Sequence, residues 1–119
     1  MKVIVIGLGA MGSSVSYHLA KRGIEVVGID QFSPPHAFGS SHGDTRILRL
    51  GYAEGMYYVP LVLRARELWK ELSNESGIEI FSETGVLSVR PNKEGSFKNS
   101  LKGIESFGIK HELLSSADI

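Results

Sequence analysis

The feature that most constrains the fold is a cluster of glycines directly after a run of β-branched residues. Residues 3–6 read Val-Ile-Val-Ile, and Gly7, Gly9 and Gly12 follow in the spacing G-x-G-x-x-G. A continuous β-branched run is typical of a strand buried on both faces of a parallel sheet. Glycines at this position favour a tight turn from the strand into a helix. The opening residues therefore predict a strand, a glycine turn and a helix in that order.

A helix and a second strand are predicted next. The helical pattern consists of apolar residues that recur every four positions, at Met11, Val15 and Leu19. Gly23 is a natural left-handed stop for this helix. Residues 26–29 then predict another strand, which ends at Asp30. Residues 2–30 thus have about the length of 30 residues that a βαβ unit needs.

Each glycine of the motif has a physical task in binding a dinucleotide. Gly7 permits the tight turn, Gly9 lets a pyrophosphate approach the backbone, and Gly12 lets the helix pack on the strand. The phosphates then meet backbone N–H groups at the positive end of the helix. The predicted cofactor-binding residues of this turn are Gly7, Gly9, Ala10, Met11 and Gly12.

Asp30 completes the fingerprint, because it lies 18 residues beyond Gly12 at the end of the second predicted strand. Its carboxylate can accept hydrogen bonds from a ribose diol. It would repel a 2′-phosphate, and no arginine adjoins it, which disfavours NADP. NAD and FAD share an ADP half, so this unit does not separate them. Two plainer readings stay open: glycines that only make turns, and an aspartate that is a solvated strand end.

Residues 31–50, "QFSPPHAFGSSHGDTRILRL", stand where a common NAD-type domain would continue with a helix and a third strand. Pro34 and Pro35 exclude a helix interior. We therefore predict a long ordered loop, leading into a short helix with Asp44 or Thr45 as its N-cap. Loops of this length in compact domains are usually functional or disordered.

Arg46 and Arg49 would share one face of that short helix, because they are three residues apart. Two guanidinium groups there could bind a carboxylate or an anionic flavin. Spacing alone favours a pair of solvated surface arginines, and it favours a hydrogen-bonded loop histidine for His42.

Four segments carry a resemblance to a known family: "GLGAMGSSVSYHLAKRG", "DQFSPPHAFGSSHGDTRILRLGY", "YVPLVLRARELWKELSNESG" and "FSETGVLSV". They closely resemble the N-terminal third of the monomeric sarcosine oxidase and N-methyltryptophan oxidase family. Its members are FAD-dependent amine oxidases of the D-amino-acid-oxidase-like superfamily. The resemblance covers nearly the whole chain and weakens after Pro91. "SHGDTR" after "PPH" is far more specific than the glycine motif.

The resemblance implies an α/β fold with an incomplete Rossmann-like βαβ FAD-binding domain, followed by the start of an α+β substrate domain. The implied division places residues 1–82 in the first domain and residues 83–119 in the second. It also implies that these residues are part of a much longer chain and are inactive by themselves. A final pattern agrees with an interrupted element, since Ser115 followed by Asp118 looks like the start of a helix.

The resemblance further implies which residues act. FAD would be held by the glycine turn and by a set that follows the second strand, at Asp30, Gln31, Ser41, His42, Gly43, Thr45 and Arg46. Arg46 would lie against the flavin ring, and Arg49 would bind the substrate carboxylate. The predicted catalytic residues are His42, Arg46 and Arg49, with no metal. The oxygen-activating lysine and the flavin-carrying cysteine of the family come later in its chain and are not assigned.

The predicted activity is oxidation of the C–N bond of a secondary amine or N-methyl amino acid, with FAD as cofactor and O2 as acceptor, giving H2O2. Three alternatives stay open. They are an FAD-dependent amino acid dehydrogenase that passes electrons to a quinone or carrier, a non-catalytic NAD- or nucleotide-binding module, and a βαβ fragment without a ligand.

Composition limits the partners. The 119 residues hold 13 acidic and 13 basic side chains and no cysteine. No charged block indicates a nucleic-acid surface, and there is no thiolate metal site. No apolar stretch reaches the roughly 20 residues of a membrane span. We expect a cytoplasmic protein that binds a small amine or amino acid and O2, and the oligomeric state stays open.

Two further helices are predicted in the second half. The first follows an apolar stripe from Tyr58, at Leu61, Ala65, Leu68, Trp69 and Leu72. Pro60 suits its first turn, Gly77 lies past its end, and Trp69 is expected in the core. The second follows a stripe stopped by Gly108, at Phe97, Leu101, Ile104 and Phe107. Residues 81–89, broken by Gly85, read as extended, and residues 109–114 could be a strand; together they would begin a second sheet.

Overall fold

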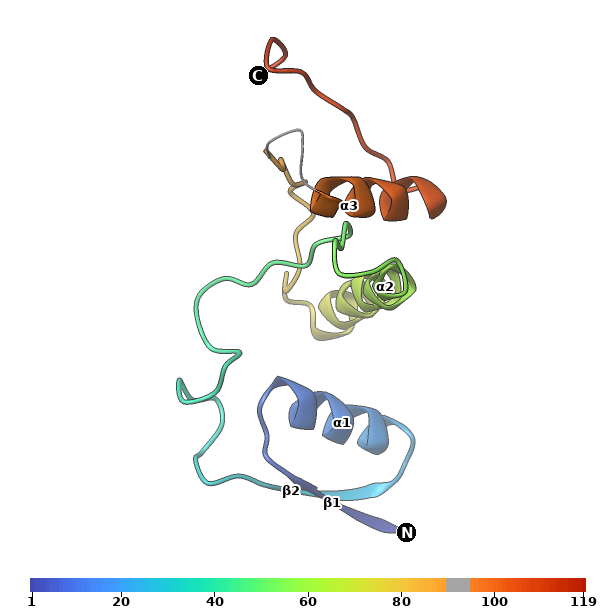
Figure 1. Ribbon diagram of the computed structural model, residues 1–119. Helices are drawn as coiled ribbons and strands as arrows, with labels where there is room; N and C mark the ends of the chain where they lie inside the picture. The colour runs from blue at the N-terminus through green and yellow to red at the C-terminus, as the bar shows by residue number, and fades with distance from the viewer. Residues whose placement is uncertain (90–94) are drawn as a thin grey trace. The chain divides into compact units, whose positions relative to one another are not determined.

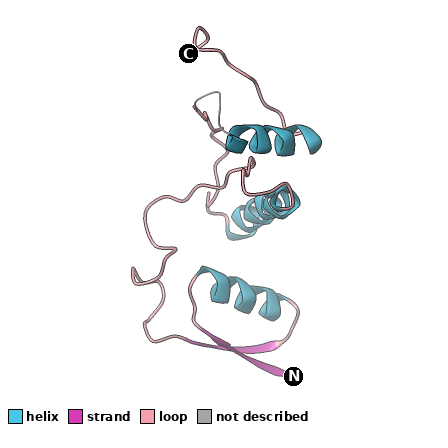
Figure 2. Ribbon diagram, viewed as in Figure 1, coloured by secondary structure: helices cyan, strands magenta, loops and turns pink. Residues whose placement is uncertain are grey.

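The computed structural model describes residues 1–89 and 95–119, and its elements are drawn in Figures 1 and 2. In chain order they are β1 (Lys2–Ile6), α1 (Ala10–Lys21), β2 (Glu25–Ile29), α2 (Tyr58–Ser76) and α3 (Gly95–Ser106). The chain divides into two compact units, Met1–Arg46 and Ile47–Ile119. Across the described residues, no helix has both the length and the apolar character needed to cross a bilayer.

The first unit is the predicted βαβ motif. Strands β1 and β2 pair in parallel, with Lys2 opposite Glu25 and Ile6 opposite Ile29. Parallel neighbours need a crossover connection, and α1 supplies it over one face of the strands (Figure 2). The fold class is therefore α/β with a Rossmann-like N-terminal unit, as the sequence predicts.

The two strands are covered on one face only within the described residues. Val3 and Val5 are half-buried, whereas Ile4 is 60% exposed and Ile6 is 85% exposed. Side chains alternate between the faces of a strand, so the two valines share the face under α1. The prediction of a strand buried on both faces is thus correct for one face and wrong for the other in the part of the chain described.

Helix α1 packs on the strands through two small residues and one leucine. Gly12, Ser16 and Leu19 are partly buried, while Met11 and Val15 of the predicted apolar stripe are largely exposed. The helix ends as predicted, because Gly23 has φ +72° and donates its N–H to Ala20 O at 2.8 Å.

The second unit contains α2 and α3. Val59 of α2 is fully buried, and a Cβ on Gly103 of α3 would lie 3.4 Å from it. Gly77 ends α2 with φ 69°, and Gly108 follows α3 with φ 62°, so both predicted helices and both stops are confirmed. Trp69 is 43% exposed, however, and the expectation that it is a core residue is wrong for the described chain.

Glu83 fastens the segment after α2 to that helix. Its carboxylate pairs with the guanidinium of Arg66 and, at 2.6 Å, with Nζ of Lys70. The Arg66 hydrogen bond, then the Lys70 hydrogen bond, lowers the pKa of Glu83 from 4.5 to about 2. All three side chains are substantially exposed, so salt will screen this cluster.

Three predicted elements differ in the structure. Residues 44–50 form no helix, since the short run is followed by Gly51 and isolated short helices are marginal. Residues 81–89 and 109–114 are not strands, because no described segment pairs with them. Ser115 and Asp118 do form the predicted cap-like turn, in which Ser115 N–H donates to Asp118 Oδ2 at 2.7 Å.

Candidate functional site: a glycine turn and a strand-end aspartate

The turn between β1 and α1 needs glycine at two positions. Gly7 has φ +88°, a conformation that strains other residues, and donates its N–H to Ile29 O at 2.7 Å. A Cβ on Gly12 would lie 1.7 Å from Gly7 O and 3.4 Å from Val5 Cγ1. The glycines therefore let the helix start directly against the end of the strand.

Gly9 is required neither by packing nor by its own conformation. It is the N-cap of α1 with φ −67°, and a Cβ placed on it would meet nothing within 4 Å. The helix start carries no side-chain cap and no acidic residue in its first turn. Ser13 N–H is bonded to Gly9 O at 2.9 Å, so the amides of Ala10, Met11 and Gly12 precede the helical ladder. An open surface at the positive end of a helix fits a diphosphate.

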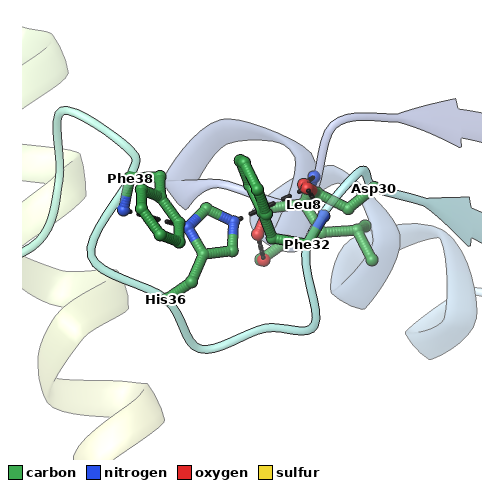
Figure 3. Close-up of polar contacts among 6 residues, drawn as sticks. Leu8, Asp30, Phe32, His36 and Phe38 are labelled. Atoms are coloured by element: carbon green, nitrogen blue, oxygen red, sulfur yellow. Dashed lines mark hydrogen bonds and ion pairs between the residues drawn. The ribbon is translucent and has the colours of Figure 1, made fainter.

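Asp30, just past β2, lies against this turn (Figure 3). Its Oδ2 accepts the N–H of Leu8 at 2.5 Å, and its Oδ1 accepts the N–H of Phe32 at 3.0 Å. These bonds, that of Phe32 first, hold the pKa of Asp30 below its usual value against the opposing effect of burial. The carboxylate is thus ionised at neutral pH and keeps acceptor capacity for a hydroxyl, since each oxygen has two lone pairs.

His36 approaches Asp30 from the following loop. Its Nε2 lies 3.5 Å from Asp30 Oδ1, and its Nδ1 accepts the N–H of Phe38 at 3.3 Å. The imidazole ring packs against Phe32 and Phe38, with centroids 5.3 and 5.9 Å away. Asp30, the glycine turn and this aromatic cluster therefore form one local arrangement.

The loop at residues 39–46 is held by its own backbone. His42 Nδ1 lies 2.9 Å from Gly39 O, and a carbonyl can only accept, so this bond requires a proton on Nδ1; Nε2 is then an acceptor in the neutral ring. Arg46 donates from Nη1 to Thr45 O at 2.8 Å and from Nη2 to Ser40 O at 3.3 Å. Of the two carbonyls, that of Thr45 is the one a helix would need, since it would accept the N–H of Arg49.

The predicted shared helical face of Arg46 and Arg49 is therefore wrong. Arg49 belongs to the second unit, where its guanidinium stands 5.6 Å from the ring centroid of Tyr52, within cation–π range. The remaining predicted residues of the first unit, Gln31, Ser41, Gly43 and Thr45, are exposed. The structure thus brings together the glycine turn and Asp30, and it leaves the roles of the loop residues as predictions.

Two residues of the arrangement were not predicted. Leu8 contributes only a backbone N–H, for which a sequence carries no side-chain signal. His36 stands in the "PPH" motif, and its signal is the aromatic spacing Phe32, His36, Phe38 directly after the strand-end acid. Among the described residues, no group of three or more His, Asp or Glu side chains could hold a metal ion.

A parallel βαβ unit with an open glycine turn and a strand-end acid defines the class of dinucleotide-binding α/β proteins. Comparison with known families narrows this class. Residues 2–119 match the FAD dependent oxidoreductase family, and the chain belongs to that family.

Individual proteins with similar sequences support this family assignment. The chain is 44% identical over 118 residues to a monomeric sarcosine oxidase of Bacillus sp. (strain NS-129), and 45% identical to that of Bacillus sp. (strain B-0618). It is 40% identical over 117 residues to an N-methyl-L-tryptophan oxidase of Yersinia pestis (strain Pestoides F). Each alignment covers 98% of this chain but only 30% to 32% of the relative.

Proposed function

We propose that this chain binds the ADP half of FAD and that the whole protein is a flavin-dependent oxidase of secondary amines or N-methyl amino acids. The observation that carries the cofactor assignment is the open backbone over Gly9, between an uncapped helix start and the Asp30 carboxylate. Family membership favours FAD over NAD for this site. The relatives named sarcosine oxidase and N-methyl-L-tryptophan oxidase support the substrate class.

Different groups of the site would bind different parts of the cofactor. Backbone N–H groups of Ala10, Met11 and Gly12 would take the diphosphate, and Asp30 would take the adenosine ribose. Gly7 holds these groups in place through its bond to Ile29 O. A bound flavin would supply the redox chemistry, which is removal of a hydride equivalent from the C–H beside the amine nitrogen and transfer of two electrons to O2, giving H2O2.

The loop residues would serve the reacting end of the cofactor. His42 presents Nε2 as an acceptor, and Arg46 is fixed by the carbonyls of Thr45 and Ser40, so its guanidinium is a preorganised positive charge. A fixed cation stabilises an electron-rich ring at little reorganisation cost. Arg49 would bind the substrate carboxylate through charge-assisted hydrogen bonds.

The experiment is a turnover assay on the protein at its native length. Purified protein is mixed with sarcosine and with N-methyl-L-tryptophan in air, and H2O2 and O2 consumption are measured together. We expect peroxide to form in equal amount to the O2 consumed. Substrate-dependent bleaching of the flavin without peroxide, followed by reoxidation only with an added quinone, would instead identify a dehydrogenase. Absence of any flavin would reject the cofactor assignment.

A further inference from the structure

The nitrogen Nε2 of His36 is an unusual group in this structure. Among the described residues it is the one buried side-chain nitrogen or oxygen that lacks a hydrogen-bond partner. Buried polar groups in native proteins are nearly always paired, so each exception needs an explanation. Because Nδ1 accepts from the Phe38 amide, the proton of the neutral ring sits on Nε2, which is then an unused donor.

This donor faces one specific acceptor. Nε2 lies 3.5 Å from Oδ1 of Asp30, and the side chains are only 15% and 10% exposed, respectively. The imidazole ring lies beside Phe32 and Phe38, with ring centroids 5.3 and 5.9 Å away (Figure 3). A shift of a few tenths of an ångström by the carboxylate would close the distance to that of an ordinary N–H···O bond, about 3 Å.

The burial of Nε2 also indicates that His36 acts on a ligand through Asp30 and not by direct contact. The atom is out of reach of solvent, so a ribose hydroxyl that arrives at the exposed tenth of the Asp30 side chain does not touch it. Asp30 already uses one lone pair on each oxygen for the amides of Leu8 and Phe32. A further donor on the buried side of the carboxylate would fix its orientation and leave its exposed part for the ligand.

We propose that His36 is a positioning residue, whose Nε2–H holds the Asp30 carboxylate in the orientation that accepts the 2′-hydroxyl of the adenosine ribose. This inference rests on the proposed function, because it assumes that a dinucleotide binds at the glycine turn. It adds to that function a specific contact with the ribose 2′-hydroxyl, which is separate from the contacts with the phosphates. The order of contact is His36 to Asp30 and Asp30 to ribose.

Two substitutions separate the donor from the ring. In His36→Asn the side-chain oxygen reaches the position of Nδ1 and keeps an acceptor for the Phe38 amide, but no donor reaches Asp30. In His36→Gln the longer side chain brings an amide N–H to the position of Nε2. Both variants lose the same aromatic packing, but His36→Asn keeps only the acceptor for the Phe38 amide and His36→Gln keeps only the donor toward Asp30. Each is prepared as native-length apoprotein and titrated with FAD and with an FAD analogue that lacks the adenosine 2′-hydroxyl.

The measured quantity is the ratio of the two dissociation constants, analogue over FAD. We expect the wild-type protein and His36→Gln to prefer FAD by about three- to tenfold, and His36→Asn to bind both ligands alike. A purely structural role would weaken both ligands equally and leave the ratio unchanged, which overturns the inference. Loss of the ratio in both variants would assign the effect to the ring and also overturn it. A wild-type protein that does not bind FAD at all would reject the proposed function itself.

Discussion

A single methyl group at Gly12 tests whether the glycine turn is built as described. In Gly12→Ala the new Cβ would lie 1.7 Å from Gly7 O and 2.9 Å from Gly7 C, whereas real Cβ atoms essentially never approach closer than 3.0 Å. The start of α1 and the turn must therefore separate by about 1.3 Å, and both contacts are to backbone, which cannot rotate away. Overpacking typically costs about 1–3 kcal/mol, and a clash with rigid backbone belongs at or above the upper end of that range.

The matched control is Gly9→Ala, which adds the same methyl group to the same turn. Its Cβ meets nothing within 4 Å, and its φ of −67° suits alanine. Its stability cost should not exceed about 1 kcal/mol, the difference between glycine and alanine at an N-cap. The assay is urea unfolding of the native-length apoprotein, followed by far-ultraviolet circular dichroism. Equal unfolding free energies for Gly12→Ala and Gly9→Ala would refute the close packing at Gly12.

Three further predictions follow from other parts of the chain. Glu83→Gln should flatten the acid-induced loss of stability between pH 4.5 and about 2. A carboxylate whose pKa is lowered in the folded state stabilises the fold above pH 4.5, and this stabilisation is lost as the pH falls through the folded-state pKa of about 2. Urea unfolding midpoints measured across this pH range at low salt test the prediction. Arg49→Met should raise KM for an N-methyl amino acid at least about tenfold and leave flavin content unchanged, because it removes a charge-assisted bond of about 1.5–3 kcal/mol; an unchanged KM excludes Arg49 from the substrate site. Gly77→Ala should destabilise α2 by about 1 kcal/mol, because φ of 69° strains alanine, and an unchanged melting temperature would contradict the left-handed cap.

The first 30 residues could be predicted from the sequence because their signals are local. A β-branched run, a glycine turn and a stop at Gly23 each specify backbone conformation within a few residues, and the structure confirms them. The two later helices were predictable for the same reason, with left-handed stops at Gly77 and Gly108. Local sequence signals are sufficient to predict an element whose structure does not depend on residues far away in the chain.

The failures concern features that depend on partners. Strands at residues 81–89 and 109–114 need a neighbour for their hydrogen bonds, and the described residues supply none. The helix expected after Asp44 is too short to persist alone before Gly51, and Arg46 instead bonds to two loop carbonyls, which no periodicity reveals. Trp69 lies on a helical stripe, but whether a stripe is buried depends on what packs against it.

The candidate site also combines features that are set by local sequence with contacts between residues far apart in the chain. The roles of Gly7 and Gly12 follow from backbone sterics and could be stated in advance. The contact of Asp30 with the Leu8 amide joins residues 22 positions apart, and the approach of His36 depends on the path of a loop. Such contacts are properties of the folded chain, and only the structure shows them.

The most direct test of the central claim is flavin content in a pair of variants at one residue. Gly9→Val places a branched side chain where a diphosphate would approach the backbone, whereas Gly9→Ala adds the smallest possible side chain; both are expressed at native length beside the wild type. We predict stoichiometric flavin in the wild-type protein, a reduced content in Gly9→Ala and none in Gly9→Val, with all three folded by circular dichroism. Full flavin loading of folded Gly9→Val would show that the cofactor does not bind over this glycine turn.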